Sequence, residues 1–183
     1  MSSSTLRSLI GVDIFTDAYR VSGRVVVTGT TTVAGELSNP NSNFLELTDA
    51  YISRLNQPGE IITSYALASL RKDNINFVVL QNRREGVPMS SQHFRSIFER
   101  GRQYHVFVTV PSFEIHGDIM YESRPTPHGV LIQSVGVFQP IFAAKASASL
   151  YPEITYSGDV ILVHKDRVGL FCLREDKKTP NLD

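Results

Sequence analysis

Glu114, His116 and Asp118 alternate along one segment and offer residue types that bind metal ions. The other positions of this segment, Phe113–Ile119, carry apolar residues or glycine. In a β-strand the three polar side chains would share one face. Neighbours on that face start roughly 6.6 Å apart, so three in a row converge poorly on one ion. We therefore interpret them as the solvated face of an amphipathic strand and expect no metal site.

An earlier segment with the same pattern, Tyr19–Val25, carries Arg20, Ser22 and Arg24 at the equivalent positions. Opposite charges at equivalent positions would attract two units of this chain, or two subunits, to each other. The sequence therefore predicts a candidate interface made of Arg20, Arg24, Glu114, His116 and Asp118.

Catalytic patterns are absent from the sequence. It contains no G-x-S-x-G, H-E-x-x-H, Walker A or G-x-G-x-x-G motif. Cys172 is the only cysteine, and its neighbours Leu170, Phe171 and Leu173 indicate a buried thiol that packs as a small hydrophobe. The remaining histidines are isolated in the sequence: His93, His105, His128 and His164. We expect no enzyme and no cofactor.

A basic connector, residues 81–104, lies between two mildly acidic halves. It carries five arginines against two glutamates, and Phe94, Phe98 and Tyr104 lie among them. Basic groups with aromatic rings are what single-stranded nucleic acid needs, although a net charge of zero gives little long-range attraction. Two lysines in predicted turns complete the candidate nucleic-acid-binding set, which is Arg83, Arg84, Arg95, Arg100, Arg102, Lys72 and Lys165.

Size and composition are those of a folded domain. The chain has 183 residues and a mass of 20.4 kDa, and 42% of its residues are hydrophobic. One cysteine excludes an internal disulfide framework. The N-terminal residues lack the pattern of a signal peptide, and no stretch approaches the length of a membrane span. We expect a cytoplasmic protein that does not contact a membrane.

An internal repeat is the strongest feature of the sequence. Tyr19–Val25 matches Phe113–Ile119 at an offset of 94 residues, and Ser69–Leu80 matches Leu162–Leu173 at an offset of 93. Between these motifs we also pair residues 44–52 with residues 130–138.

Each copy of the repeat has the alternating pattern and the turn residues of β-strands. Gly23 and Gly117 lie inside predicted strands, where glycine usually marks a bulge or a sharp bend. One segment, about 90–101, has the cap residues and apolar stripe of a helix. The predicted strands are 18–28, 31–37, 44–54, 61–71 and 75–81, followed by 105–110, 112–122, 129–138, 141–150, 158–165 and 168–174.

Each unit resembles the Sm-like small β-barrels, in which a helix precedes five bent strands. Val21-x-Gly23-x-Val25 and Ile115-x-Gly117-x-Ile119 match their first motif, and the Lys-Asp turns take the place of their second. Residues 44–50 also resemble the F-x-x-L-T-D-A strand of an uncharacterised bacterial domain. The resemblance implies two tandem barrels and self-association through barrel edges. The Asn step and Arg-Gly turn of Sm-like RNA sites are missing, so RNA binding is not implied.

The sequence thus predicts a mainly β fold of two tandem five-stranded Sm-like barrels joined by one short α-helix. The expected domains are 1–80, a connector 81–104, a second unit 105–174 and a polar tail 175–183. The favoured function is a non-enzymatic structural or interaction module that binds itself or another protein. The alternatives are binding of RNA or single-stranded DNA, and a small-ligand site at the junction of the barrels.

Overall fold

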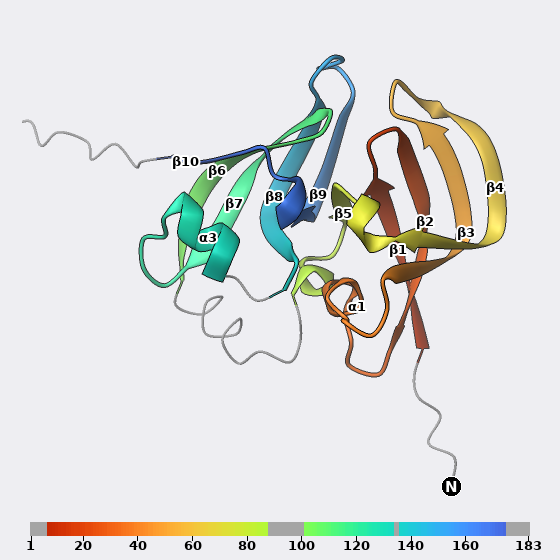
Figure 1. The fold of residues 1–183 in the computed structure, drawn as a ribbon, viewed down its shortest axis with the longest axis horizontal. Helices are drawn as coiled ribbons and strands as arrows, with labels where there is room; N and C mark the ends of the chain where they lie inside the picture. The colour runs from red at the N-terminus through yellow and green to blue at the C-terminus, as the bar shows by residue number, and fades with distance from the viewer. Residues whose placement is uncertain (1–6, 88–100, 134–135, 175–183) are drawn as a thin grey trace, which may run out of the picture.

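The computed structural model describes residues 7–87, 101–133 and 136–174, which form a mainly β fold (Figure 1). The elements of the first half are β1 (Arg7–Phe15), β2 (Tyr19–Thr28), α1 (Val33–Leu37), β3 (Phe44–Arg54), β4 (Gln57–Arg71), the 3-10 turn η1 (Lys72–Asn74), β5 (Phe77–Leu80) and η2 (Arg83–Gly86). Those of the second half are β6 (Arg102–Val110), β7 (Phe113–Tyr121), α3 (Pro127–Gln133), β8 (Phe138–Ala148), β9 (Thr155–His164), η3 (Lys165–Arg167) and β10 (Leu170–Leu173).

All the described strands belong to one antiparallel sheet with the order β10-β6-β7-β8-β9-β5-β1-β2-β3-β4. Figure 1 shows β4 at one end of this sheet and β10 at the other. Among the described residues, no helix has the length and apolar character needed to cross a bilayer.

The internal repeat is present in the structure and extends over both halves. Each half runs strand, strand, short helix, two strands, 3-10 turn and final strand. In equivalent positions lie β1 and β6, β2 and β7, α1 and α3, β3 and β8, β4 and β9, and β5 and β10. The predicted pairing of residues 44–52 with 130–138 is therefore wrong, because the equivalent of β3 is β8, which begins at Phe138.

Two predicted strands, 31–37 and 129–138, are also wrong, because each contains a short helix instead. The cause is a threonine cap at equivalent positions. The Thr32 hydroxyl accepts a hydrogen bond from the Gly35 amide at 3.2 Å, and the Thr126 hydroxyl accepts one from the Gly129 amide at 3.0 Å. Such caps satisfy amide groups that the first turn of a helix leaves unpaired.

The predicted irregularities at Gly23 and Gly117 are confirmed. The register of β2 against β3 shifts between Ser22 and Arg24, and that of β7 against β8 shifts between His116 and Asp118. Opposite each bulge a residue of the neighbouring strand has a positive φ, 51° at Asp49 and 46° at Ala143. The bulges bend each half of the sheet at the same place.

The expected closure of each half into its own five-stranded barrel is not found. The sheet is open, with β4 and β10 as its end strands. In the first half β5 pairs with β1 on one side and with β9 of the second half on the other. The edge of β5 is therefore already occupied, and none of the described strands pairs with the outer edge of β4.

Buried side chains form two cores. The first core surrounds Ile14, Leu47 and Ile75, and the second surrounds Val108 and Ile115. The predicted linking helix at about 90–101, except for Gly101 at its end, and the polar tail 175–183 lie outside the described residues.

Candidate functional site: the edges of the sheet and the junction of its halves

The pairing of β5 with β9, which we call the junction, joins the two halves of the chain. Four residue pairs form it: Phe77 with Val163, Val78 with Leu162, Val79 with Ile161 and Leu80 with Val160. All eight side chains are buried. The junction therefore shows how one half of this protein binds another, through backbone pairing and a shared apolar interior.

Each junction strand contributes side chains to the core of the opposite half. Phe77 and Val79 of the first half lie in the second core, while Val160 and Leu162 of the second half lie in the first core. The alternate side chains of each strand lie in the core of their own half: Val78 and Leu80 in the first core, and Ile161 and Val163 in the second. This exchange follows from the alternation of strand side chains between two faces.

Aromatic rings from both halves pack together at the junction. The Phe15 and Phe77 rings stack with centroids 4.4 Å apart, and the Phe113 ring meets them edge-on at 5.3 and 4.9 Å. Tyr156 lies 4.5 Å from Phe15, and the Arg20 guanidinium lies 5.2 Å from the Tyr156 ring centroid. Aromatic contacts of this kind add to the energy gained by burying the rings.

Three polar residues close one end of the junction, and we call them the polar lock: Asp17, Asn76 and Arg167. The buried Asn76 amide donates to the Asp17 carboxylate at 3.0 Å and accepts from the Arg167 guanidinium at 2.8 Å. Arg167 also forms an ion pair with Asp17. Hydrogen bonds from Arg167 and then Asn76 lower the pKa of Asp17 below 3.8. The lock holds a first-half loop against a second-half turn.

The outer strands of the sheet, β4 and β10, expose apolar side chains, and no other described strand pairs with their outer edges. In β4 the exposed fractions are 74% for Leu67, 59% for Tyr65 and 58% for Ile61. In β10, Leu170 is 50% exposed. Cys172 is exposed as well, so the prediction of a buried thiol is wrong, because Cys172 lies on the opposite face of the strand from the buried Phe171. Unpaired strand edges of this kind are templates for pairing with another chain.

The two turn lysines predicted to bind nucleic acid are partly withdrawn from solvent. The Lys72 ammonium is buried and donates to the Glu36 and Asn39 carbonyls, at 2.7 and 3.1 Å, where α1 ends. Burial lowers the pKa of Lys72 and of Lys165, which is half-buried. Lys72 therefore serves the fold, and its position argues against a contact with phosphate.

The predicted arginine cluster is only partly described. Arg95 and Arg100 lie outside the described residues. Arg83 and Arg84 are exposed in η2, where the Arg83 guanidinium lies 4.5 Å from the ring centroid of Phe142. Arg102 is exposed at the start of β6. Arg84 and Arg102 lie on the surface of the described connector, and nucleic-acid binding stays a prediction.

The charged residues of the predicted interface mostly pair within their own halves. The Arg20 guanidinium lies 2.8 Å from the Asp13 carboxylate, and that of Arg24 lies 3.7 Å from the carboxylate of Asp49. Asp118 accepts from Gln103 at 2.6 Å and lies 3.1 Å from the His105 ring.

Glu114 and His116 point outward from the same strand, and the His116 ring lies 4.8 Å from that of Phe107. Within the described part of the chain, no three His, Cys, Asp or Glu side chains gather as a metal site. Within this set, Arg20 contacts the other half of the chain through the Tyr156 ring. The structure therefore places the apolar junction, and not this charged set, between the halves.

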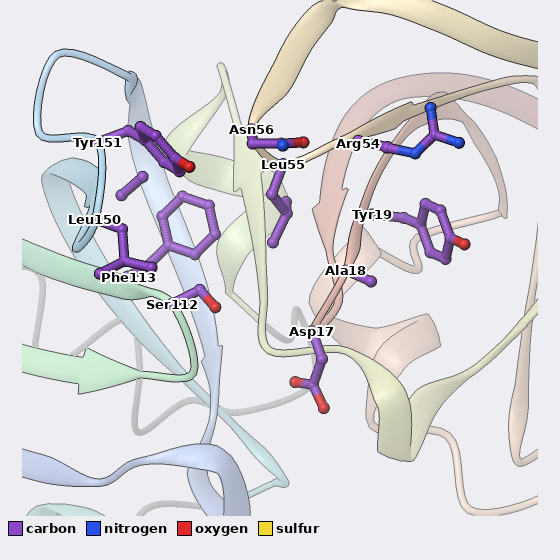
Figure 2. Close-up of a pocket in the computed structure, with 11 residues that line it drawn as sticks. Asp17, Ala18, Tyr19, Arg54, Leu55, Asn56, Ser112, Phe113, Leu150 and Tyr151 are labelled. Atoms are coloured by element: carbon purple, nitrogen blue, oxygen red, sulfur yellow. The ribbon is translucent and has the colours of Figure 1, made fainter.

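A small pocket opens beside the junction (Figure 2). Its volume is about 240 Å³, and its lining includes Tyr19 and Leu55 of the first half and Phe113 and Tyr151 of the second. In Figure 2 the Leu55 side chain lies between Tyr19 and the two rings of the second half, and the Tyr19 ring is turned away from them. Asp17, also in its lining, is already bound within the polar lock. Because pockets for drug-sized ligands usually exceed about 300 Å³, this one suits only a fragment.

The apolar edge residues of β4 were not among the predicted site residues. Their signal was readable: Ile61–Leu70 holds no charged residue and carries large apolar side chains at both odd and even positions. A strand of a sheet with one solvated face would alternate instead.

Comparisons with family models, with curated proteins and with solved structures found no match for this chain.

Proposed function

We propose that the protein is a non-enzymatic interaction module that self-associates through the edges of its sheet. It would consist of two tandem five-stranded units of the Sm-like type, as the internal repeat suggests. The observation that carries the proposal is β4, a 15-residue end strand with exposed apolar side chains on both faces.

Proteins that stay monomeric protect such an edge with charges, prolines, bulges or a covering segment. From Ile61 to Leu70, β4 has no charge and no proline. Its register shifts lie near the hairpin turn, at Ser53 and Arg54 of β3, away from the exposed Tyr65 and Leu67. An apolar edge left in this state supports a role in binding another strand.

The test is the mass of the protein in solution by size-exclusion chromatography with light scattering. We expect the wild type to exceed 20.4 kDa in a concentration-dependent way. Leu67→Lys places a charge on the edge at a residue that is 74% exposed, so the fold is kept while assembly is lost. Ile132→Lys on α3, 65% exposed, is the matched control and leaves the mass unchanged.

A wild type that stays at 20.4 kDa at every concentration contradicts the proposal. Equal loss of mass in the Leu67 and Ile132 variants also contradicts it, because the effect would then not depend on the edge. The same run records absorbance at 260 and 280 nm. The chain has no Trp and only 7 Tyr, so bound nucleic acid would dominate its spectrum and favour that alternative.

A further inference from the structure

We infer that the β4 edge of one chain pairs with the β10 edge of a second copy, in the register already used by the junction. This inference rests on the proposed self-association, and it adds the partner edge, the strand direction and the residue register. Its basis is the internal repeat, which relates the two outer strands to the two strands of the junction.

The two outer edges are the repeat equivalents of the two junction strands. At the junction β9 pairs with β5. The repeat makes β4 the equivalent of β9 and β10 the equivalent of β5. Figure 1 shows β4 and β10 at opposite ends of the sheet, and no other described strand pairs with the outer edge of either. A second copy brings the missing strand to each end.

The side chains of β10 are arranged as those of β5 would be before pairing. Phe77 and Val79 of β5 enter the core of the opposite half, and their equivalents in β10 are Leu170 and Cys172, which are exposed. The alternate residues of β10 face the core of their own half: Phe171 belongs to the second core, and Leu173 packs against that core.

The side chains of β4 show the matching arrangement. Leu67, the equivalent of Val160, is 74% exposed, and Ser69, the equivalent of Leu162, is exposed too. Ala68 and Leu70 pack against the first core, the core of their own half. On both outer edges, the exposed side chains occupy repeat positions whose equivalents at the junction lie in the core of the opposite half.

Residues beside the edges continue this correspondence. Phe138 and Phe113 are buried near the junction. Their repeat equivalents in the first half, Phe44 and Tyr19, are 48% and 46% exposed. The first half thus exposes large aromatic side chains at positions whose equivalents in the second half are buried near the junction.

Carrying the junction register over to the outer edges gives four residue pairs between chains: Leu70 with Leu170, Ser69 with Phe171, Ala68 with Cys172 and Leu67 with Leu173. The contact is heterologous, because different surfaces of the two copies meet. Repetition of a heterologous contact produces a closed ring or a filament.

The contact between chains would lack the polar lock. The repeat equivalents of its three residues are Pro111, Gly169 and Asn74, which do not form such a network. Small side chains also replace larger ones, with Cys172 in place of Val79 and Ser69 in place of Leu162. We therefore expect an assembly that dissociates on dilution, while the junction inside each chain stays closed.

Cross-linking through Cys172, the only cysteine, tests the register. Ala68→Cys adds a thiol directly opposite Cys172 of the next copy. Opposed residues in an antiparallel pair have Cα atoms about 4.5–5.5 Å apart, within the range for a disulfide. With oxidised glutathione, denaturing electrophoresis without reductant is expected to show a ladder at multiples of 20.4 kDa.

Ser69→Cys is the matched control, because it lies one residue further along the same edge and faces the other side of the sheet. It is expected to cross-link no more than the wild type. Ala68→Cys combined with Cys172→Ser is expected to give no cross-link, since β4 edges would not meet each other.

Three results would overturn the register while leaving self-association intact. The first is an assembly seen by light scattering in which Ala68→Cys gives no ladder. The second is equal cross-linking by Ser69→Cys, and the third is a dimer of the Ala68→Cys, Cys172→Ser variant. A wild type that is monomeric at every concentration would instead remove the proposed function itself, so the two failures are distinguishable.

Discussion

Alanine at two equivalent glycines is expected to have unequal effects, because the two bulges differ in free space. Neither Gly23 nor Gly117 has a positive φ, so side-chain contacts decide the outcome. A Cβ at Gly117 would lie 2.6 Å from the Ile141 side chain and 2.8 Å from the Phe142 carbonyl oxygen. At Gly23 the shortest contact is 3.2 Å, to the Thr48 carbonyl oxygen.

The magnitudes follow from these contacts. Overpacking of a tight site costs about 1–3 kcal/mol, and replacing glycine by alanine returns about 0.4–1 kcal/mol through the unfolded chain. Gly117→Ala should therefore lose about 1–2 kcal/mol of unfolding free energy, and Gly23→Ala should stay within about 0.5 kcal/mol of the wild type. At about 2–4 °C per kcal/mol for this size, the Tm of Gly117→Ala falls by about 2–8 °C.

Scanning calorimetry of the wild type and both variants measures this difference. All three proteins are compared at one concentration, because self-association makes Tm depend on concentration. Equal losses at both glycines, or a larger loss at Gly23, would refute the argument from the bulge contacts.

Three further substitutions test single contacts by urea unfolding. Asp17→Asn removes the charge that faces Arg167 and should cost about 0.5–1 kcal/mol at neutral pH, since the carboxylate is largely exposed. Because folding lowers the pKa of Asp17, its contribution is present above pH 3.8 and is lost in acid; a difference from wild type that persists at pH 2 would contradict this. Burial lowers the pKa of His164 from 6.5, so the unfolded chain takes up the proton first and stability falls as the pH drops below 6.5. His164→Asn keeps an acceptor for the Asp166 amide, which now lies 3.2 Å from the imidazole, and should flatten this dependence; an unchanged slope would show that other groups cause it. Tyr156→Phe should raise the unfolding free energy by about 1 kcal/mol, because its buried hydroxyl has no hydrogen-bond partner among the described residues; a loss would reveal a partner.

Local patterns were sufficient to predict the repeat and its bulges. The offsets of 93 and 94 residues locate equivalent strands, and glycine inside a strand pattern marks the bend at Gly23 and Gly117. β1 was not predicted, although Ile10, Val12 and Ile14 alternate in it as they do in a strand with one buried face.

Features that depend on contacts distant in sequence were not predictable in this way. α1 has only five residues, which is too short for a helical period, and it depends on the Thr32 cap and on burial of its apolar residues. The β5–β9 pairing joins strands about 83 residues apart in sequence. No local sequence pattern indicates whether β5 pairs with β9 or with its repeat equivalent β4. The polar lock depends on that choice, so Asp17 and Arg167 gave no signal either.

The most direct test of head-to-tail edge pairing is the mass of an equimolar mixture of Leu67→Lys and Leu170→Lys. Each variant has one blocked edge and one intact edge, and both side chains are exposed in the single chain. At concentrations where the wild type is assembled, light scattering should give 20.4 kDa for each variant alone and twice that mass for the mixture. A mixture that stays at 20.4 kDa, or a Leu170→Lys variant that assembles alone, would contradict the pairing of β4 with β10.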